Sequence, residues 1–429
     1  MQLEIGASSV GGNIRLTTSK SHTLRAVLLA SLASGVSHVR QILPSPDTQA
    51  MIEACSAFGA EITRHDGDLQ ITGFAGVPSV PKQVVNVGNS GQVLRFGAAI
   101  SALVPQYSIF TGDDSICSLR PMKPLLDGLQ QLGAFAESSR GCGYAPVIIR
   151  GPASAGHVVM EGQDSQPVSA MLFLAACLEG ETTLEVRDAG EKPWIDLTLH
   201  WLDRMGVRYE RDAYAWYRVY GQAAHARFSP FDYTVPGDWS SAAFPLAAAI
   251  LCNCGLTLEN MDIHDPQGDK AIVDIFRKMG AVLDVDEVGR KVIVRRHGGL
   301  RGISVDVNAV IDAVPILATL ACFAQGPTTL TGAAIARQKE SDRVAAIATE
   351  LAKMGGRFEI FDDGLTIHPA VLHGARVNSW HDHRIAMSLA VAALRCGNTT
   401  VENTDCVAKS FPGFAASMAR IGAAITETV

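Results

Sequence analysis

The sequence lacks any long apolar run and any paired cysteine motif. No stretch of the 429 residues reaches the ~18 uninterrupted apolar residues that a membrane helix requires, and residues 1–14 carry an acid and no apolar run of the kind found in export signals. We therefore expect a protein that is neither exported nor membrane-spanning. The nine cysteines are scattered, with only Cys252 and Cys254 close together and no Cys-x-x-Cys or Cys/His ligand spacing. This pattern indicates neither a zinc site nor a disulfide framework, and it fits a reducing cytoplasm.

A surplus of positive charge is also missing. The formal net charge is −7, whereas general nucleic-acid binders usually carry a basic stripe that neutralises phosphates. We expect no nucleic-acid partner. Any anion that the protein binds must instead be held by a local group of cations.

The composition is that of a compact α/β protein. The chain has 47% hydrophobic residues, 18% charged residues and 40 glycines, without low-complexity segments. Its length is too great for one ordinary hydrophobic core, so we expect two domains of about 200 residues each.

An internal repeat is the most informative feature of the sequence. Six amphipathic stretches end in a large apolar residue followed by a glycine, and these glycines are 74, 73, 74, 75 and 67 residues apart: Gly59, Gly133, Gly206, Gly280, Gly355 and Gly422. A glycine just beyond an i, i+3, i+4 apolar pattern is the expected helix stop, because the residue after the last helical turn often needs a positive φ. Strand-like segments such as 281–285 follow. The pattern predicts a helix and then a strand at the end of each unit.

A second series runs out of phase with the glycines and predicts the start of another helix in each unit. Its members each precede a run of small apolar residues and are of the types that cap helices: Ser21, Asn89, Asp164, Asp238, Asp312 and Asp382. Taken singly, each is read as a simple N-cap.

Six units of about 70 residues predict two domains of three units each. We place the boundaries so that residues 19–235 form one domain, and residues 1–18 with 236–429 form the other. If the capped helices of both domains point inward, their N-termini make one cleft attractive to anions without a metal. We therefore expect a doubly anionic ligand, no metal and no cofactor.

Nine short motifs then occur in a recognisable order over nearly the whole chain. They are Ser19-Lys20-Ser21 with Arg25, Gly88-Asn89-Ser90-Gly91 with Arg95, Arg120-Pro121-Met122, Asp164-Ser165-Gln166, Gly237-Asp238-Trp239-Ser240-Ser241, Asp312-Ala313, Lys339-Glu340-Ser341-Asp342-Arg343, His381-Asp382-His383-Arg384 and Lys409-Ser410-Phe411-Pro412. In order and spacing this series resembles the 5-enolpyruvylshikimate-3-phosphate synthases of the enolpyruvyl transferase family. The resemblance implies a two-domain, inside-out α/β barrel built from six βαβαββ-like repeats.

The resemblance also implies an activity. Such an enzyme moves the carboxyvinyl group of phosphoenolpyruvate onto a hydroxyl of a small phosphorylated acceptor, here shikimate 3-phosphate, and releases phosphate. Its partners would be these two small molecules, with the chain acting as a monomer.

The resemblance assigns roles to particular residues. Asp312 would be the base near the acceptor hydroxyl, Glu340 would exchange a proton with the methylene carbon, and Lys20 would donate to the phosphate bridge. Planar guanidinium groups match carboxylates and phosphates, so Arg343 and Arg384 would hold phosphoenolpyruvate together with Lys20 and Lys409. The full set of implied substrate-binding residues is Lys20, Ser21, Arg25, Asn89, Gly91, Arg120, Ser165, Gln166, Asp312, Lys339, Arg343, Arg384 and Lys409.

The acceptor side departs from the family pattern. The family usually has an arginine four residues before the Arg-Pro pair, in a segment that helps to hold phosphoenolpyruvate, but here this segment contains only Arg120. Further departures are Asp164 and Glu191 at positions that commonly present serines, Trp194 at a tyrosine position, Ile335 at an asparagine position and Gln92 at a threonine position. Acids beside a phosphate repel it unless a cation intervenes.

These departures leave three alternatives open. Enolpyruvyl transfer to a nucleotide sugar hydroxyl, such as that of UMP, is one, and the related use of UDP-N-acetylglucosamine would give Cys117 a role, although a lone cysteine is more often a packed residue. A non-catalytic binding paralogue is another. RNA 3′-phosphate cyclases share related repeats, but the net negative charge argues against them.

Overall fold

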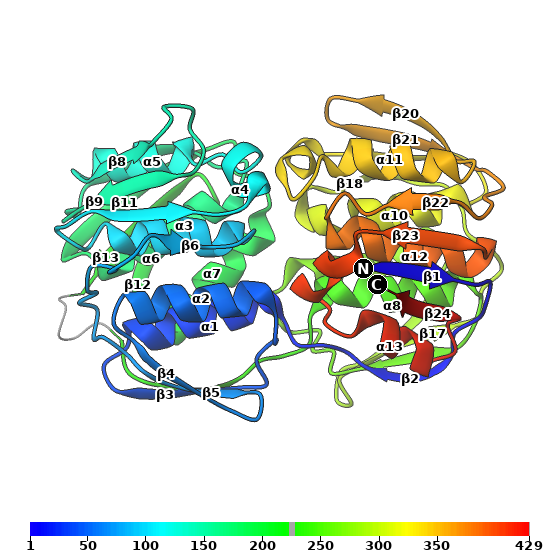
Figure 1. The fold of residues 1–429 in the computed structure, drawn as a ribbon, viewed down its shortest axis with the longest axis horizontal. Coiled ribbons are helices and arrows are strands. Elements are labelled where there is room, and N and C mark those ends of the chain that lie inside the picture. The colour runs from blue at the N-terminus through cyan, green and yellow to red at the C-terminus, as the bar shows by residue number, and fades with distance from the viewer. Residues whose placement is uncertain (223–227, 429) are drawn as a thin grey trace. The chain divides into compact units, whose positions relative to one another are not determined.

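A computed structural model describes residues 1–222 and 228–428 of the protein (Figure 1). The chain divides into two compact units, one formed by Met1–Thr17 with Pro236–Val429 and the other by Thr18–Val235. Each unit has a hydrophobic core of its own. We call them the terminal unit and the central unit.

The sheets repeat with one topology throughout the described residues. There are six four-stranded sheets, three in each unit, in the orders β14-β3-β5-β4, β6-β7-β9-β8, β10-β11-β13-β12, β2-β15-β17-β16, β18-β19-β21-β20 and β22-β23-β1-β24. In every sheet the first pair of strands is parallel and the next two pairs are antiparallel. The six βαβαββ-like repeats predicted from the sequence are therefore confirmed.

The central unit contains three repeats. Its strands are β3 (Val36–Arg40), β4 (Glu61–His65), β5 (Asp68–Thr72), β6 (Val85–Asn86), β7 (Ser108–Thr111), β8 (Phe135–Ser138), β9 (Val147–Arg150), β10 (His157–Glu161), β11 (Gly180–Arg187), β12 (Arg208–Asp212), β13 (Trp216–Gly221) and β14 (Asp232–Thr234). Its helices are α1 (Lys20–Leu32), α2 (Pro46–Ala57), α3 (Gly91–Ser101), α4 (Asp114–Ser118), α5 (Lys123–Gln131), α6 (Ser165–Cys177) and α7 (Lys192–Arg204). Figure 1 shows β3, β4 and β5 as a layer against α1 and α2.

The terminal unit contains the other three repeats. Its strands are β1 (Gln2–Ile5), β2 (Gly12–Arg15), β15 (Leu256–Glu259), β16 (Val282–Asp286), β17 (Lys291–Arg295), β18 (Ser304–Asp306), β19 (Thr328–Thr331), β20 (Arg357–Phe361), β21 (Gly364–His368), β22 (Arg376–Asn378), β23 (Thr399–Glu402) and β24 (Ile425–Thr428). Its α-helices are α8 (Trp239–Leu251), α9 (Ile272–Lys278), α10 (Val314–Cys322), α11 (Arg343–Lys353), α12 (His383–Cys396) and α13 (Phe414–Arg420). Short 3₁₀ helices precede four of them: η2 (Gly268–Ala271), η3 (Asn308–Ala313), η4 (Ala334–Gln338) and η5 (Thr404–Lys409).

The chain crosses between the units immediately after a strand. β2 pairs in parallel with β15 of the terminal unit, although α1, the next element along the chain, belongs to the central unit. In the same way β14 pairs in parallel with β3 before α8 opens the second stretch of the terminal unit. The backbone N–H of Asp238 donates to the Thr17 carbonyl at 3.0 Å, so residues next to the two crossings are hydrogen-bonded.

Helices form the interior of each unit. Nearly every residue of α1, α3, α6, α8, α10 and α12 is buried. In the terminal unit α8, α10 and α12 pack against one another, and in the central unit α3 packs on α6. A helix that is apolar all round is stable only inside a core, which explains why the predicted small-residue runs are surrounded by the other elements.

The helix stops predicted from the glycine series are confirmed. All six glycines follow directly on the C-cap residue of a helix and have φ between 70° and 108°. Side chains with a Cβ rarely adopt this left-handed conformation, so glycine at these positions ends the helix at little cost.

The predicted N-caps are confirmed in three units and wrong in three. Asp164, Asp238 and Asp382 cap α6, α8 and α12 through their side chains. The side-chain caps of α1 and α3 are Ser19 and Ser90, each a residue or two from the predicted Ser21 and Asn89. Asp312 lies inside η3 and caps nothing, because its carboxylate is engaged by arginines.

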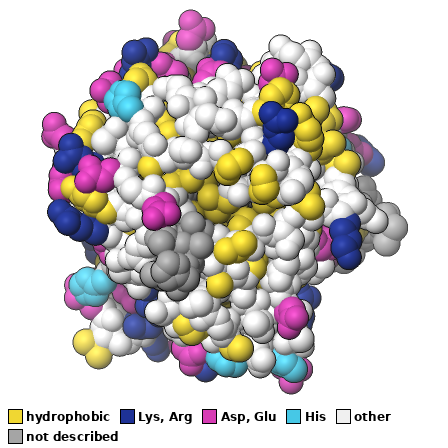
Figure 2. All heavy atoms as spheres, turned by 90° about the vertical axis from the view of Figure 1, so that its left-hand side faces the viewer, with side chains coloured by type: hydrophobic (Ala, Val, Ile, Leu, Met, Phe, Trp, Pro, Cys, Tyr) yellow, Lys and Arg dark blue, Asp and Glu magenta, His cyan; other side chains and the backbone are white. Residues whose placement is uncertain are grey.

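Two expectations from the sequence concern membrane-spanning helices and a basic stripe on the surface. Among the described residues, no helix combines the length and the apolar character that crossing a membrane would need. On the face drawn in Figure 2, the Lys and Arg side chains of the described residues are interspersed with acidic ones and do not form a continuous basic stripe.

Candidate active site

Arg343 holds three carboxylates in the terminal unit. It is the first residue of α11, with 1% of its side chain exposed. Its Nε lies 2.8 Å from Asp382 Oδ2, its Nη1 lies 2.5 Å from Asp312 Oδ1, and its Nη2 lies 2.8 Å from Glu340 Oε2. Burial alone would lower the pKa of Arg343, but the charges of the three carboxylates raise that pKa well above its usual value. The guanidinium therefore stays charged and fixes the carboxylates in space.

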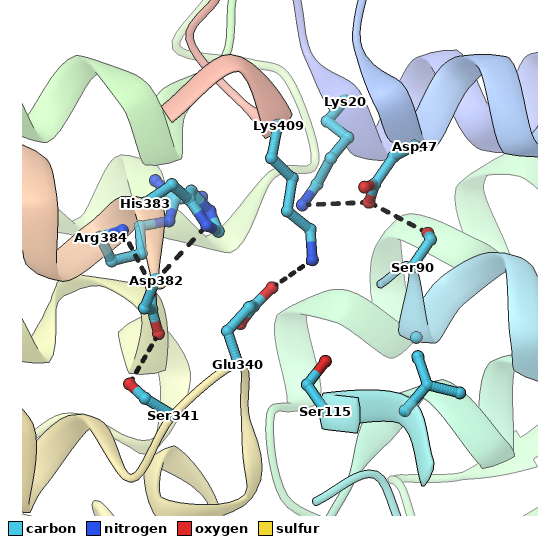
Figure 3. Close-up of polar contacts among 12 residues, drawn as sticks. Lys20, Asp47, Ser90, Ser115, Glu340, Ser341, Asp382, His383, Arg384 and Lys409 are labelled. Atoms are coloured by element: carbon cyan, nitrogen blue, oxygen red, sulfur yellow. Dashed lines mark hydrogen bonds and ion pairs between the residues drawn. The ribbon is translucent and has the colours of Figure 1, made fainter. Parts of the chain in front are cut away.

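Lys409 contacts the same group of residues. It ends η5 and places Nζ 2.6 Å from Glu340 Oε1, with 4% and 7% of the two side chains exposed (Figure 3). Glu340 thus lies between two cations. A carboxylate in this setting has little freedom to rotate, which suits a group that must address one particular atom.

Arg384 belongs to the first turn of α12. Asp382 caps that turn by accepting from the Arg384 backbone N–H at 2.8 Å, and it also accepts from the Ser341 hydroxyl at 3.1 Å (Figure 3). Arg384 Nη2 donates to Asp312 Oδ2 at 3.1 Å. Its Nε and Nη1 are buried and have no hydrogen-bond partner among the described residues. Those two donors are suited to an anion, because a buried donor without an acceptor costs free energy.

Asp269 is a member of this group that the sequence reasoning missed. It lies in η2, 2% exposed, and accepts a short hydrogen bond from the Ser240 hydroxyl. Burial and the neighbouring Asp312 charge raise the pKa of Asp269 to about 7, against the opposing effects of Ser240 and Arg384. The sequence around it, Gly268-Asp269, matches no motif that indicates a catalytic or binding residue.

Among the residues that the structure describes, one cluster of potential metal ligands lies in this site, and the absence of a metal stays a prediction. Glu340, Asp382 and His383 offer three ligand atoms within 4.8 Å of one another. Both carboxylates already share Arg343, and Lys409 also contacts Glu340. A divalent cation would have to displace this guanidinium, so the cluster is better suited to anions than to a metal.

Lys20 is fixed within the central unit by a buried acid. Its Nζ lies 3.6 Å from Asp47 Oδ2, and the Ser90 hydroxyl donates to the same oxygen at 3.0 Å (Figure 3). Asp47 sits in the first turn of α2 with 4% of its side chain exposed. The starts of three helices, α1, α2 and α3, therefore meet here.

Gly91 and three long polar side chains are also brought together in the central unit. Arg95 Nη1 donates to Gln166 Oε1 at 3.0 Å, linking α3 to α6. A Cβ built on Gly91 would lie 2.8 Å from Arg95 Nη1, 3.1 Å from Gln166 Oε1 and 3.6 Å from Arg120 Nη1. A larger residue at position 91 would therefore force the ends of the Arg95 and Gln166 side chains to shift.

The acids on the acceptor side have partners that explain their presence. Asp164 Oδ2 lies 2.9 Å from Arg95 Nη2. The negative charge of Asp164, which would repel a phosphate, is therefore paired with a cation. Glu191 accepts from both the backbone N–H and the hydroxyl of Ser165, at 3.0 and 3.1 Å. The hydroxyl of Ser165 is therefore directed to Glu191.

Arg25 is buried among neutral groups. It donates to the Thr198 hydroxyl at 3.0 Å, to the Ser21 carbonyl at 3.2 Å and to the Trp194 carbonyl at 3.5 Å. Burial lowers the pKa of Arg25 to about 9. Within the part of the chain that the structure describes, no carboxylate pairs with this guanidinium, and a buried charge in such surroundings favours an anionic ligand.

Four further positions that the sequence singled out are characterised by their location and burial. Asn89 is half-buried in the turn before α3, and Lys339 is 6% exposed directly before Glu340. Ile335 belongs to the core of the terminal unit, and Cys117 packs against that of the central unit. A packing role therefore suffices for Cys117.

Comparison with known proteins identifies the family. The family model of EPSP synthase (3-phosphoshikimate 1-carboxyvinyltransferase) matches residues 5–418. This chain belongs to the EPSP synthase family. It is 38% identical over 426 residues to the 3-phosphoshikimate 1-carboxyvinyltransferase of Ruminiclostridium cellulolyticum, with 99% of each chain covered. It is 41% identical over 415 residues to that of Chlamydia muridarum, which covers 96% of this chain and 92% of the relative.

Solved structures confirm the predicted fold class. An EPSP synthase from Acinetobacter baumannii matches with a TM-score of 0.79 and 29% identity over 99% of both chains. The enolpyruvyl transferase NikO from Streptomyces tendae matches with a TM-score of 0.80, covering 100% of this chain and 98% of that one. At 20% identity the second likeness shows the fold alone.

The comparisons confirm the predicted enzyme class and reaction. Membership of the EPSP synthase family supports enolpyruvyl transfer from phosphoenolpyruvate to shikimate 3-phosphate and does not favour the nucleotide or non-catalytic alternatives. They leave the roles of individual residues untested.

Proposed function

We propose that Arg343, Arg384, Glu340, Asp312 and their neighbours carry out this EPSP synthase reaction, in which phosphoenolpyruvate and shikimate 3-phosphate give a carboxyvinyl ether and inorganic phosphate. The observation that supports the assignment is that the buried guanidinium of Arg343 binds both Asp312 and Glu340, the two carboxylates proposed to transfer protons. Next to them, Arg384 Nε and Nη1 are buried and have no hydrogen-bond partner among the described residues.

The donor substrate brings a carboxylate and a phosphate. Arg343, Arg384 and Lys409 supply three buried cations of the terminal unit, and Lys20 supplies one from the central unit. Arg384 Nε and Nη1 lie on different edges of the guanidinium, so each can donate a separate hydrogen bond to an anionic group. Preorganised cations of this kind stabilise the charge that develops on phosphate as it leaves.

The proton transfers follow from the two carboxylates. Asp312 accepts the proton of the acceptor hydroxyl as its oxygen attacks C2 of phosphoenolpyruvate. Glu340 starts this step in its protonated form and delivers that proton to the methylene carbon, so that the double bond becomes a methyl group in a tetrahedral intermediate. In the second half the Glu340 carboxylate takes a proton back from that methyl group, the double bond re-forms, the C2–O bond breaks and phosphate leaves with a proton from Lys20 on its bridging oxygen. The proton held by Asp312 then returns to Lys20 through solvent, which restores both groups.

The acceptor is assigned to the remaining predicted residues. These are Ser21, Arg25, Asn89, Gly91, Ser165, Gln166 and Lys339. Arg25 is buried and is proposed to receive negative charge of the acceptor. Arg120 is also buried, and it is proposed to contact phosphoenolpyruvate because it belongs to the segment that the family resemblance gives to that substrate. The chain is proposed to act as a monomer of two domains in a reducing cytoplasm, where its nine free thiols would persist.

Phosphate release tests the proposed acceptor. Purified protein is given phosphoenolpyruvate with shikimate 3-phosphate, UMP or UDP-N-acetylglucosamine. We expect release with shikimate 3-phosphate at a kcat/KM at least about a hundredfold above the other two, because a site built for particular hydroxyl and phosphate groups rejects analogues that leave its polar groups unpaired. Faster release with UMP or UDP-N-acetylglucosamine would overturn the acceptor. Tight binding without release would support the non-catalytic alternative.

A further inference from the structure

Glu350 is a buried carboxylate outside the set of residues used so far. It lies on α11 and is 1% exposed. Oε2 accepts from the backbone N–H of Asn378 at 2.9 Å and from Lys353 Nζ at 2.6 Å, and Oε1 accepts from Trp380 Nε1 at 2.7 Å. Two of these three donors lie in residues 378–381, which we call the loop and which run from the last residue of β22 toward α12.

This loop has an unfavourable backbone. Trp380 and His381 are consecutive and have φ values of 55° and 54°. The left-handed region costs a non-glycine residue roughly 1–2 kcal/mol, so two in succession must be held by their surroundings. The Trp380 ring is 47% exposed, so its indole N–H is held by Glu350 while much of the ring remains in solvent.

The loop is followed directly by Asp382, which contacts Arg343 and Arg384, two of the cations proposed to bind phosphoenolpyruvate; we call these cations, with Lys20 and Lys409, the anion site. The backbone N–H of Asp382 donates to the Ser379 carbonyl at 3.0 Å. Asp382 then holds Arg343 Nε and caps the turn that carries Arg384. Glu350 and Arg343 are seven residues apart on α11, which is about two turns and puts them on the same face. α11 is therefore attached to the loop twice, through Glu350 at residues 378 and 380 and through Arg343 at Asp382.

We propose that Glu350 is a positioning residue that holds Trp380 and His381 in their left-handed conformation and thereby sets Arg343 and Arg384 for the donor anion. The inference rests on the proposed function through the assignment of the anion site. The carboxylate acts through the loop and does not touch substrate.

Glu350→Gln is the first test. The amide keeps the volume but replaces one acceptor by a donor that faces N–H groups, so one of the two hydrogen bonds between Glu350 and residues 378–381 is lost. We expect the affinity for phosphoenolpyruvate, measured calorimetrically, to fall about tenfold, which corresponds to one charge-assisted contact. The turnover number at saturating substrate should fall less than about threefold. Glu402→Gln is the matched control, because Glu402 pairs with Arg376 on the neighbouring strands at the surface and should leave both constants unchanged.

A rescue variant separates positioning from general stability. Glycine adopts positive φ freely, so His381→Gly should keep the loop in place without Glu350. We expect the double variant Glu350→Gln/His381→Gly to regain most of the lost affinity. Unchanged affinity in Glu350→Gln, or no recovery in a folded double variant, would overturn the inference.

Trp380→Phe provides a second route if Glu350→Gln fails to fold. It removes only the indole N–H and should weaken phosphoenolpyruvate binding about threefold, whereas unchanged affinity in that variant would count against the inference. A wild-type protein that does not bind phosphoenolpyruvate at all would contradict the proposed function. Equal binding by the wild type and every variant would contradict only the role of Glu350.

Discussion

Arg343 and Asp312 are joined by a hydrogen bond of 2.5 Å between Nη1 and Oδ1, in which the arginine is 1% and the aspartate 22% exposed. The other Nη of the same guanidinium binds Glu340. The two carboxylates proposed to act on oxygen and on carbon are therefore oriented by one cation. Such preorganisation avoids rearrangement at the moment of reaction.

Asp312→Asn should abolish most of the turnover while preserving the fold. A general base contributes about 10²- to 10⁴-fold, so we expect kcat to fall by that order with a smaller change in substrate affinity. Because Asp312 caps no helix, loss of activity in this variant cannot be ascribed to a lost cap. Steady-state kinetics with circular dichroism provide the measurement. The exposed Asp284, paired with Arg295, supplies the control variant Asp284→Asn, which should retain full activity.

Arg384→Ala should weaken the binding of phosphoenolpyruvate at least about tenfold, since one charge-assisted contact contributes roughly 1.5–3 kcal/mol. Titration calorimetry of the folded variant checks this. Arg395→Ala changes an arginine in the last turn of the same helix and should bind like the wild type. Equal affinities of the Arg384 and Arg395 variants would remove Arg384 from the anion site.

Asp269 should make the stability of the protein depend on pH. Its pKa in the folded protein is raised to about 7, mainly by burial, above the ~3.9 of an unfolded chain. Between these values the folded state binds more protons than the unfolded state. Stability from this group is therefore fully present below about pH 4 and is lost as the pH rises to about 7.

The variant Asp269→Asn removes this titration. We expect the free energy of unfolding of the variant, relative to the wild type, to rise between about pH 4 and pH 7 and then to stay level, as measured by urea denaturation. A difference that does not change across this range would show that Asp269 is ionised throughout.

Gly91→Ala should disturb the polar group of the central unit. The added Cβ would lie 2.8 Å from Arg95 Nη1, and Arg95 is also held by Asp164 and the Pro121 carbonyl. Overpacking typically costs about 1–3 kcal/mol, so we expect the KM for shikimate 3-phosphate to rise at least about fivefold. Gly156→Ala is the control in the same unit, because its Cβ would make only an ordinary contact with Leu132 at 3.4 Å. Similar kinetics of the two variants would argue against a role for this close approach.

The repeat architecture could be predicted because its signals are local. A glycine such as Gly280 favours the positive φ with which a helix often ends, and five spacings of 67 to 75 residues define the repeat unit. The N-caps were less secure, since Ser19 and Ser21 are chemically alike and both stand at the start of a small-residue run. Only the backbone geometry shows which hydroxyl reaches the free N–H groups.

The partners within the site could not be predicted. Asp269 is 29 residues from Ser240 and Glu350 is 30 residues from Trp380, and neither acid belongs to a motif with its own chemistry. The pairing of Asp164 with Arg95 likewise depends on how α3 packs against α6. Sequence patterns identified the charged groups, but packing decides which of them neutralise one another.

The most direct test of the account is the exchange of the methylene protons of phosphoenolpyruvate. The wild-type protein, incubated in D₂O with phosphoenolpyruvate and shikimate 3-phosphate, should incorporate deuterium into the vinyl group during turnover, as observed by NMR. Glu340→Gln should lower incorporation and turnover together by about 10²- to 10⁴-fold, because one group delivers and removes that proton. Near-wild-type incorporation and turnover in the folded Glu340→Gln variant would contradict the assignment of Glu340.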